Sequence, residues 1–125
     1  NEVNMLRLVH FEIPADNTER ANEFYSSVFG WDMKQFGDQD YWFANTGDPN
    51  TPGINGAIMQ RKYPQQPVVN SISVPSVDDY AKKVTEAGGQ IVVPKFTVAG
   101  AGYLAFFKDL DGNIFGLWQD DTSAK

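Results

Sequence analysis

The chain has 125 residues, 42% of them hydrophobic, which suffices for the core of one globular domain but not for two that each fold alone. It has no cysteine, which excludes disulfides, thiolate metal sites and a cysteine nucleophile. The formal net charge is −6 and the ten basic residues are dispersed, which argues against a nucleic-acid partner because such binding depends on neutralising phosphates.

The sequence also lacks the signals of a membrane protein. It contains no run of about eighteen apolar residues, and its N-terminus lacks the basic-then-apolar order of a secretion signal. We therefore expect no membrane partner, and the absence of cysteine is compatible with a reducing, cytoplasmic location.

The first half of the chain predicts a strand, a capped helix and three further strands. Met5 to Pro14 nearly alternates apolar and polar residues and stops at proline. Asp16 can cap the helix, with Glu19 three residues later completing a capping-box pattern, and Gly30 ends it. The apolar stripe of this helix comprises Ala21, Phe24, Tyr25, Val28 and Phe29. Three short strands are expected at Trp31 to Phe36, Tyr41 to Asn45 and Ile54 to Arg61.

The second half repeats this order. Val68 to Val74 predicts a strand, and Ser76 caps a helix with Asp79 three residues later. The helix stripe comprises Val77, Tyr80, Ala81 and Val84. Strands are then expected at Gln90 to Val93, Gly102 to Lys108 and Asn113 to Gln119. Asp109 and Asp111 fall in the turn between the last two strands, where we interpret them as turn caps rather than as a catalytic pair.

The periodicity thus predicts one α+β domain over residues 1–125, made of two βαβββ modules at about residues 5–62 and 67–120. Each module has a helix on only one face of its sheet. The other face must be buried or must line a cleft.

Several short segments resemble the vicinal oxygen chelate superfamily, which includes glyoxalase I, extradiol dioxygenases and the fosfomycin-resistance and bleomycin-resistance proteins. They are His10, Phe24-Tyr25, Phe29-Gly30, Val74 to Gly89 and Phe107 to Asn113. The resemblance covers nearly the whole chain and points to the branch related to lactoylglutathione lyase. It implies pseudo-two-fold symmetry between the modules, with a curved eight-stranded mixed sheet around a cleft.

The resemblance also implies where a divalent metal would bind. Metal-dependent members place four His, Glu or Gln ligands in the cleft, and His10 falls on the first position. The other three positions hold Val69, Gly116 and either Gly56 or Ala57, none of which donates a lone pair from its side chain. One imidazole does not hold a catalytic divalent ion. We therefore predict no metal and no other cofactor, with Glu12 pairing with His10 or lying at the sheet rim rather than serving as a second ligand.

Without those ligands, the implied cleft is expected to be roomier and more apolar. Strand alternation suggests six apolar residues that line it beside His10, each of which could instead be ordinary core: Trp42, Met59, Tyr103, Phe107, Ile114 and Trp118. An apolar wall with few polar groups is the usual composition of a small-molecule site.

Three functions remain open on the sequence. We favour a metal-free protein that binds a small organic molecule, similar to the glyoxalase and bleomycin-resistance type. The alternative is a lyase or isomerase related to lactoylglutathione lyase, in which His10 and Glu12 transfer protons. A third is a subunit whose main task is association, for which the resemblance implies a homodimer because family members are often dimers.

Overall fold

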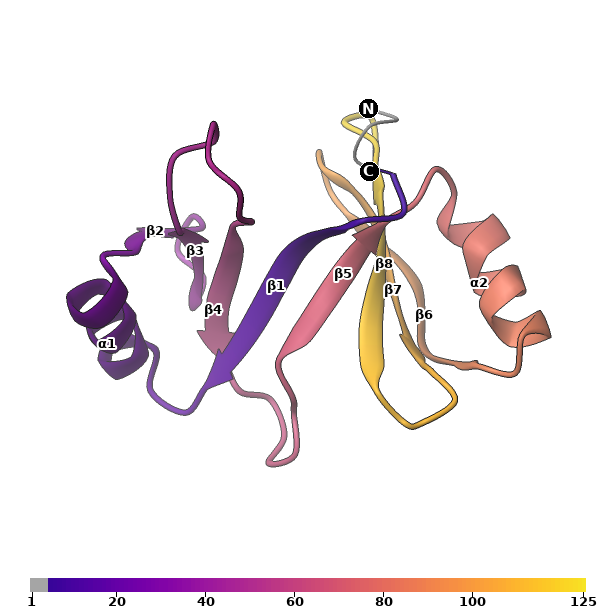
Figure 1. The fold of residues 1–125 in the computed structure, drawn as a ribbon, viewed down its shortest axis with the longest axis horizontal. Helices are drawn as coiled ribbons and strands as arrows, with labels where there is room; N and C mark the ends of the chain where they lie inside the picture. The colour runs from indigo at the N-terminus through magenta and orange to yellow at the C-terminus, as the bar shows by residue number, and fades with distance from the viewer. Residues whose placement is uncertain (1–4) are drawn as a thin grey trace. The chain divides into compact units, whose positions relative to one another are not determined.

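The structure is a computed structural model that describes residues 5–125. It confirms the predicted α+β class, with eight strands in mixed pairing and two helices, and the order β-α-β-β-β occurs twice (Figure 1). The chain divides into two compact units, one formed by His10–Val69 and the other by the remaining described residues. The pseudo-two-fold symmetry, the shared cleft and the homodimer stay predictions.

The first unit contains a four-stranded sheet in the order β2-β3-β4-β1 and helix α1. Strands β1 and β4 pair in parallel, and the other pairs are antiparallel. The elements are β1 (Leu8–Ala15), α1 (Thr18–Phe29), β2 (Asp32–Gln35), β3 (Tyr41–Asn45) and β4 (Gly56–Gln60).

The second unit repeats this plan, with strands in the order β5-β8-β7-β6 and helix α2. Its parallel pair is β5 with β8. The elements are β5 (Val69–Ser73), α2 (Val77–Glu86), β6 (Gln90–Val98), β7 (Gly102–Lys108) and β8 (Ile114–Asp120).

Helix α1 is capped one residue later than predicted. The side chain of Asn17, not Asp16, accepts a hydrogen bond from the backbone N of Arg20 at 3.0 Å. The Asp16 carboxylate instead accepts from Arg61 Nε at 2.8 Å, so it is not available to the helix. Gly30 ends the helix as predicted, at a φ of 74° that glycine adopts without steric cost.

Helix α2 covers one face of its sheet with a packed core. Ser76 caps it as predicted and accepts a hydrogen bond from the backbone N of Asp79. Four residues form the buried centre: Val74, Val77, Ala105 and Leu117. Six half-buried side chains pack around them: Ile72, Tyr80, Ala81, Val84, Tyr103 and Phe107. The predicted stripe of this helix therefore does face the core.

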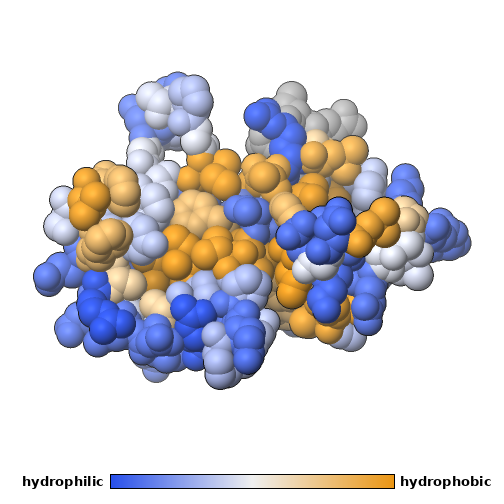
Figure 2. All heavy atoms as spheres, turned by 60° about the horizontal axis from the view of Figure 1, so that its bottom comes forward, coloured by the Kyte–Doolittle hydropathy of each residue, from blue (hydrophilic) through white to orange (hydrophobic). Residues whose placement is uncertain are grey.

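The stripe predicted for helix α1 is only partly buried, so that prediction is wrong for three of its five residues. Tyr25 stacks on Trp31 with ring centroids 4.9 Å apart, but Phe24, Val28 and Phe29 are 54%, 56% and 60% exposed. The apolar arc of α1 is wider than its contact with β2 and β4. In the space-filling view, apolar residues accordingly reach the surface between charged ones (Figure 2).

Strand β6 is longer than predicted and runs through Pro94 to Val98. Its pairing with β7 shifts register on both sides of Val93, which marks a bulge or irregularity there. Proline lacks a ladder donor but is tolerated at bulges and on edge strands, and β6 is the last strand in the order of its unit. Within residues 5–125, no helix is both long and apolar enough to cross a membrane.

Candidate functional site

Strand register sorts the side chains of the first unit onto two faces. Residues paired directly across strands point to the same side, and side chains alternate along each strand. Ala57 pairs with both Glu12 and Phe43, and Met59 pairs with Tyr41. These residues share one face with His10 and Phe36, and we call it the His10 face. The opposite face, toward α1, carries Phe11, Ile13, Trp42 and Ile58.

Three polar side chains meet on the His10 face. The Tyr41 hydroxyl donates to Glu12 Oε2 at 2.7 Å and lies 3.3 Å from His10 Nε2, while His10 Nε2 and Glu12 Oε2 are 3.9 Å apart. The expected pairing of His10 with Glu12 is therefore bridged by Tyr41. The side chains of His10 and Glu12 are 31% and 23% exposed, so the group remains within reach of a ligand.

The hydrogen-bond order within this trio determines which atoms remain free. Glu12 is the nearer and the charged acceptor, so it takes the Tyr41 hydroxyl proton. The Tyr41 oxygen then accepts from His10, which places hydrogen on His10 Nε2 and leaves a lone pair on Nδ1. The trio therefore offers acceptors, at His10 Nδ1 and the Glu12 carboxylate.

Burial sets the protonation states of the trio. It lowers the pKa of His10 from 6.5, and the charge of Glu12 opposes this only in part. Burial also raises the pKa of Tyr41, helped by the charge of Glu12 and by the hydrogen bond to it. At neutral pH the site thus holds a neutral imidazole and a protonated phenol.

An aromatic group adjoins the trio. The ring of Tyr41 lies 6.1 Å from that of Phe36 and 5.5 Å from that of Phe43, and the Phe36 and Phe43 centroids are 5.4 Å apart. Phe36 and Phe43 are 43% and 42% exposed. The His10 face therefore combines a small polar centre with accessible aromatic surface.

Two predicted lining residues of the first unit lie on opposite faces. Met59 is on the His10 face, where it is 5% exposed. Trp42 pairs with Ile58 on the α1 face and donates from Nε1 to Asp40 Oδ1 at 3.1 Å. Trp42 and Met59 therefore cannot line the same surface, contrary to the sequence prediction.

The four predicted lining residues of the second unit also divide. Tyr103 and Phe107 pack against the α2 core, which corresponds to their alternative interpretation as ordinary core. Ile114 and Trp118 alternate with the core residue Leu117 and lie on the other face, where Trp118 pairs with Leu104. Trp118 Nε1 donates to Asp120 at 2.7 Å. A binding role for Ile114 and Trp118 stays a prediction.

Two of the implied ligand positions have no room for a side chain: Gly56, which lies beside Phe11 on the α1 face, and Gly116, which lies beside Ser71. The roomier cleft itself stays a prediction. A Cβ on Gly56 would overlap the ring of Phe11, and one on Gly116 would meet Ser71 Oγ and, at 3.2 Å, Leu104. Val69 is 9% exposed. Neighbouring side chains thus occupy the volume that longer residues would need.

The residues present do not fit the implied metal. In the described part of the chain, no three His, Cys, Asp or Glu side chains lie close enough to hold an ion. Among the described candidates for metal ligands, His10 and Glu12 approach each other, and the Tyr41 hydroxyl proton is bound to Glu12 between them. Such sites typically need about three protein ligands.

Asp109 is engaged by its own turn. Its Oδ1 accepts from the backbone N of Asn113 at 2.8 Å and of Asp111 at 2.9 Å, and these bonds lower the pKa of Asp109. This supports its interpretation as a turn cap.

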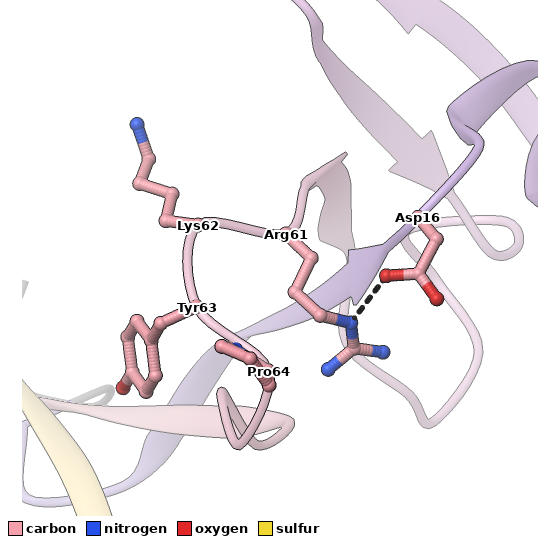
Figure 3. Close-up of a pocket in the computed structure, with 5 residues that line it drawn as sticks. All are labelled: Asp16, Arg61, Lys62, Tyr63 and Pro64. Carbon is pink, nitrogen blue, oxygen red and sulfur yellow. Dashed lines mark hydrogen bonds and ion pairs between the residues drawn. The ribbon is translucent and has the colours of Figure 1, made fainter.

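A surface depression near the end of β4 is lined by Asp16, Arg61, Lys62, Tyr63 and Pro64 (Figure 3). Arg61 turns toward Asp16, and Lys62 points away from this pair. The Arg61 guanidinium also donates to the carbonyl oxygens of Gln66 at 2.7 Å and Pro14 at 3.3 Å. Arg61 thus ties the loop to β1, and each of its three nitrogens donates a hydrogen bond within the protein.

Sequence reasoning missed Tyr41, Phe36 and Phe43 as site residues. Tyr41, Trp42 and Phe43 are three consecutive aromatics, so alternation in polarity could not indicate which of them share a face with His10. The available signal was spacing, because Tyr41 and Phe43 are two residues apart and must lie on the same side of a strand.

Comparisons with known proteins match nearly the whole chain. The model of the Glyoxalase/Bleomycin resistance protein/Dioxygenase superfamily matches residues 7–117. The candidate glyoxylase CFP32, from Mycobacterium tuberculosis and Mycobacterium bovis, is 29% identical in an alignment of 117 positions that covers 86% of this chain and 43% of CFP32. The chain therefore spans less than half the length of these curated relatives.

Solved structures share the fold. A glyoxalase/bleomycin resistance protein/dioxygenase superfamily member from Vibrio splendidus is 18% identical, with a TM-score of 0.66 over 94% of this chain and 100% of that one. Methylmalonyl-CoA epimerase from Mycobacterium tuberculosis is 16% identical, with a TM-score of 0.64 over 91% of this chain and 87% of the epimerase. At these identities the likeness concerns the fold alone.

Proposed function

The chain belongs to the Glyoxalase/Bleomycin resistance protein/Dioxygenase superfamily, and on that premise we propose that its His10 face binds a small organic molecule without a divalent metal. The proposal depends on one observation above all, the trio of His10, Glu12 and Tyr41 beside partly exposed rings. A few placed polar groups in apolar surroundings are what small-molecule sites typically contain.

The donor set supports the metal-free part of the proposal. Apart from His10, the family's implied ligand positions hold glycine, alanine or valine, and Ser71 and Leu104 occupy the space beside Gly116. Glu12 is bound by the Tyr41 hydroxyl at 2.7 Å. A ligand is then held by hydrogen bonds and apolar contact rather than by chelation.

Binding is tested with a small-molecule library by thermal shift and by NMR of the imidazole. His10 is the only histidine, so one imidazole signal reports on this face without overlap from another. A ligand at 100 times its dissociation constant adds about 2.7 kcal/mol to stability. We expect hits that raise the melting temperature and also shift the His10 signal.

Matched variants localise the binding. Tyr41→Phe removes the hydroxyl that holds His10 and Glu12 in place and should weaken hits about tenfold, about 1.4 kcal/mol, because the two acceptors lose their fixed orientation. Tyr80→Phe removes a hydroxyl from α2 in the other unit and should leave affinity unchanged. Equal affinities in both variants would place binding elsewhere, and a library without hits would refute the proposal.

A second candidate function is a proton-transferring lyase or isomerase, favoured by the neutral state of His10. Its lowered pKa and the free Nδ1 lone pair suit a general base near neutral pH. Glu12 would act through Tyr41 by orienting the imidazole. This is the alternative in which His10 and Glu12 serve proton transfer.

Solvent exchange tests this alternative directly. Carbonyl compounds with an acidic neighbouring C–H bond, and a hemithioacetal substrate, are incubated with the protein in D2O and followed by NMR. Catalysis by His10 predicts deuterium incorporation that falls at least about a hundredfold in His10→Gln. Exchange at the same rate in the variant would exclude His10 as the base, and elemental analysis of the purified protein tests the absence of metal.

A further inference from the structure

We propose that the ligand of the His10 face is an organic ammonium ion, an amine cation with an apolar or aromatic body. The inference rests on the proposed small-molecule function and adds the chemical class. It comes from the hydrogen-bond inventory of the trio, from the mutual angles of three rings, and from the charges on this face.

The atoms of the trio that remain free can accept hydrogen bonds from a ligand but cannot donate them. The Tyr41 hydroxyl proton is bound to Glu12, and the His10 Nε2 hydrogen is bound to Tyr41. What remains is a carboxylate, which only accepts, and the Nδ1 lone pair of His10. A ligand completes this set by bringing donors, and an ammonium group brings donors together with the charge that Glu12 attracts.

The three aromatic rings also attract a cation. The planes of Phe36, Tyr41 and Phe43 stand at 69°, 68° and 76° to one another in edge-to-face pairs, and we call this group the aromatic corner. The face of each ring carries negative electrostatic potential. Phe36 and Phe43 are partly exposed, so their rings can receive a cation, the contact with which proteins recognise substituted ammonium groups.

Charges on the face agree with a cationic ligand. Pairing with β3 places Asp32 and Lys34 of β2 on the side of Phe43, where their opposite charges offset one another. Glu12 then sets the sign of the field at the trio. The net charge of −6 acts in the same direction at longer range.

Other ligand classes fit less well. A carboxylate or phosphate would meet Glu12 while the donors of Tyr41 and His10 are engaged. A neutral aromatic molecule would satisfy the rings but would desolvate the Glu12 carboxylate without replacing its hydrogen bonds with water.

The test uses three probes that share one aromatic body: phenethylammonium, 2-phenylethanol and 3-phenylpropionate. Affinities are measured by NMR titration of the His10 signal and by calorimetry, at neutral pH and at two salt concentrations. We expect the cation to bind at least about tenfold more tightly than the alcohol, with the carboxylate weakest. The preference for the cation should shrink as salt rises, because screening weakens the Glu12 attraction.

Two variants separate the contributions. Phe43→Leu keeps apolar bulk but removes a ring, and should weaken the cation about two- to fivefold with little effect on the alcohol. Glu12→Gln should remove most of the charge preference. Phe24→Leu is the matched control, with the same replacement at an exposed position of α1. It should leave the affinities for the cation and for the alcohol unchanged.

The outcomes separate this inference from the proposed function. If the alcohol or the carboxylate binds as tightly as the cation, the ligand class is wrong while small-molecule binding stands. If Phe43→Leu weakens cation and alcohol alike, the ring acts only by apolar contact and the aromatic corner is not a cation site. If neither the probes nor the library bind, both proposals fail.

Discussion

The two units repeat one topology but use their side chains differently. In the second unit α2 buries a compact core around Leu117, which is 2% exposed. In the first unit α1 leaves Phe24 more than half exposed, while the sheet face away from α1 carries His10, Glu12 and Tyr41. The corresponding face of the second unit carries Ser71, Gly116 and Trp118, and its titratable groups, Lys108 and Asp120, lie at strand ends. The second unit therefore has the more completely buried core, and the first unit carries the candidate functional residues.

The largest expected effect is on the core of the second unit. Leu117→Ala should lower the free energy of unfolding by about 2–5 kcal/mol, because it leaves a cavity between α2 and its sheet. Phe24→Ala, on the exposed side of α1, should cost less than about 1 kcal/mol. Urea unfolding measures both, and similar losses would break the contrast between the two helices.

Gly56 tests whether the first unit is tightly packed where it replaces an implied ligand. Gly56→Ala should destabilise by about 1–3 kcal/mol, because the new methyl group would overlap the Phe11 ring. Gly47→Ala is the control, since its Cβ would meet only Thr51 Oγ1 at an ordinary 3.8 Å. A neutral Gly56→Ala, measured by thermal unfolding, would mean that the Phe11 ring can move aside and that this part of the α1 face is loosely packed.

Within residues 5–125, each unit pairs one arginine or lysine with a carboxylate, and the contributions of these two pairs should differ. Arg61→Met removes hydrogen bonds to Asp16 and to two carbonyl groups and should cost about 1–2 kcal/mol. Lys95→Met removes an exposed contact with Asp78 and a cation–π contact with the Tyr103 ring, and should cost less than about 1 kcal/mol. Denaturant curves at low and high salt check this, and only the Lys95 effect should vanish at high salt.

His10 should give stability a pH dependence. Its folded pKa lies below 6.5, so between that pKa and 6.5 the unfolded chain binds more protons than the folded one. Stability therefore rises with pH through this window, by at most about 1.4 kcal/mol per pH unit for one proton. His10→Gln should flatten this part of the curve, and an unchanged slope would assign it to other groups.

The smallest expected effect is a change in the pKa of His10, measured by NMR. The charge of Glu12 raises the pKa of His10 against the larger lowering by burial, so Glu12→Gln should lower that pKa further. Titration of the single imidazole signal measures the change. Asp109→Asn, in a turn of the other unit, serves as the control and should leave the signal where it is. A rise in the His10 pKa would contradict the geometry of the trio.

Local signals predicted the elements well. The βαβββ order, the Ser76 cap and the Gly30 stop all depend on neighbours within a few residues, and all three are confirmed. The Asp16 cap is wrong because Asn17 is an equally good cap one residue later. Polarity alone does not choose between adjacent residues of similar propensity.

The site was predicted only in part. His10 was found from the family resemblance, and Glu12 because alternation places it on the same side of that strand. Tyr41, which joins them, lies 29 residues from Glu12 in sequence, and no local pattern relates the two. Trp42 was assigned to the wrong face because the choice between Tyr41 and Trp42 depends on how β3 pairs with β4.

The amino-acid sequence by itself determined a twofold repeat of strands and helix, the family, and the lack of donor side chains at three ligand positions. Helix caps, turns and periodicity are short-range, so they can be identified from neighbouring residues. Only the tertiary structure decided that Tyr41 bridges His10 and Glu12, that Phe11 fills the space beside Gly56, and that α1 leaves apolar side chains uncovered. Those outcomes depend on strand register and on packing between distant segments, where a shift of one residue moves every side chain to the other face.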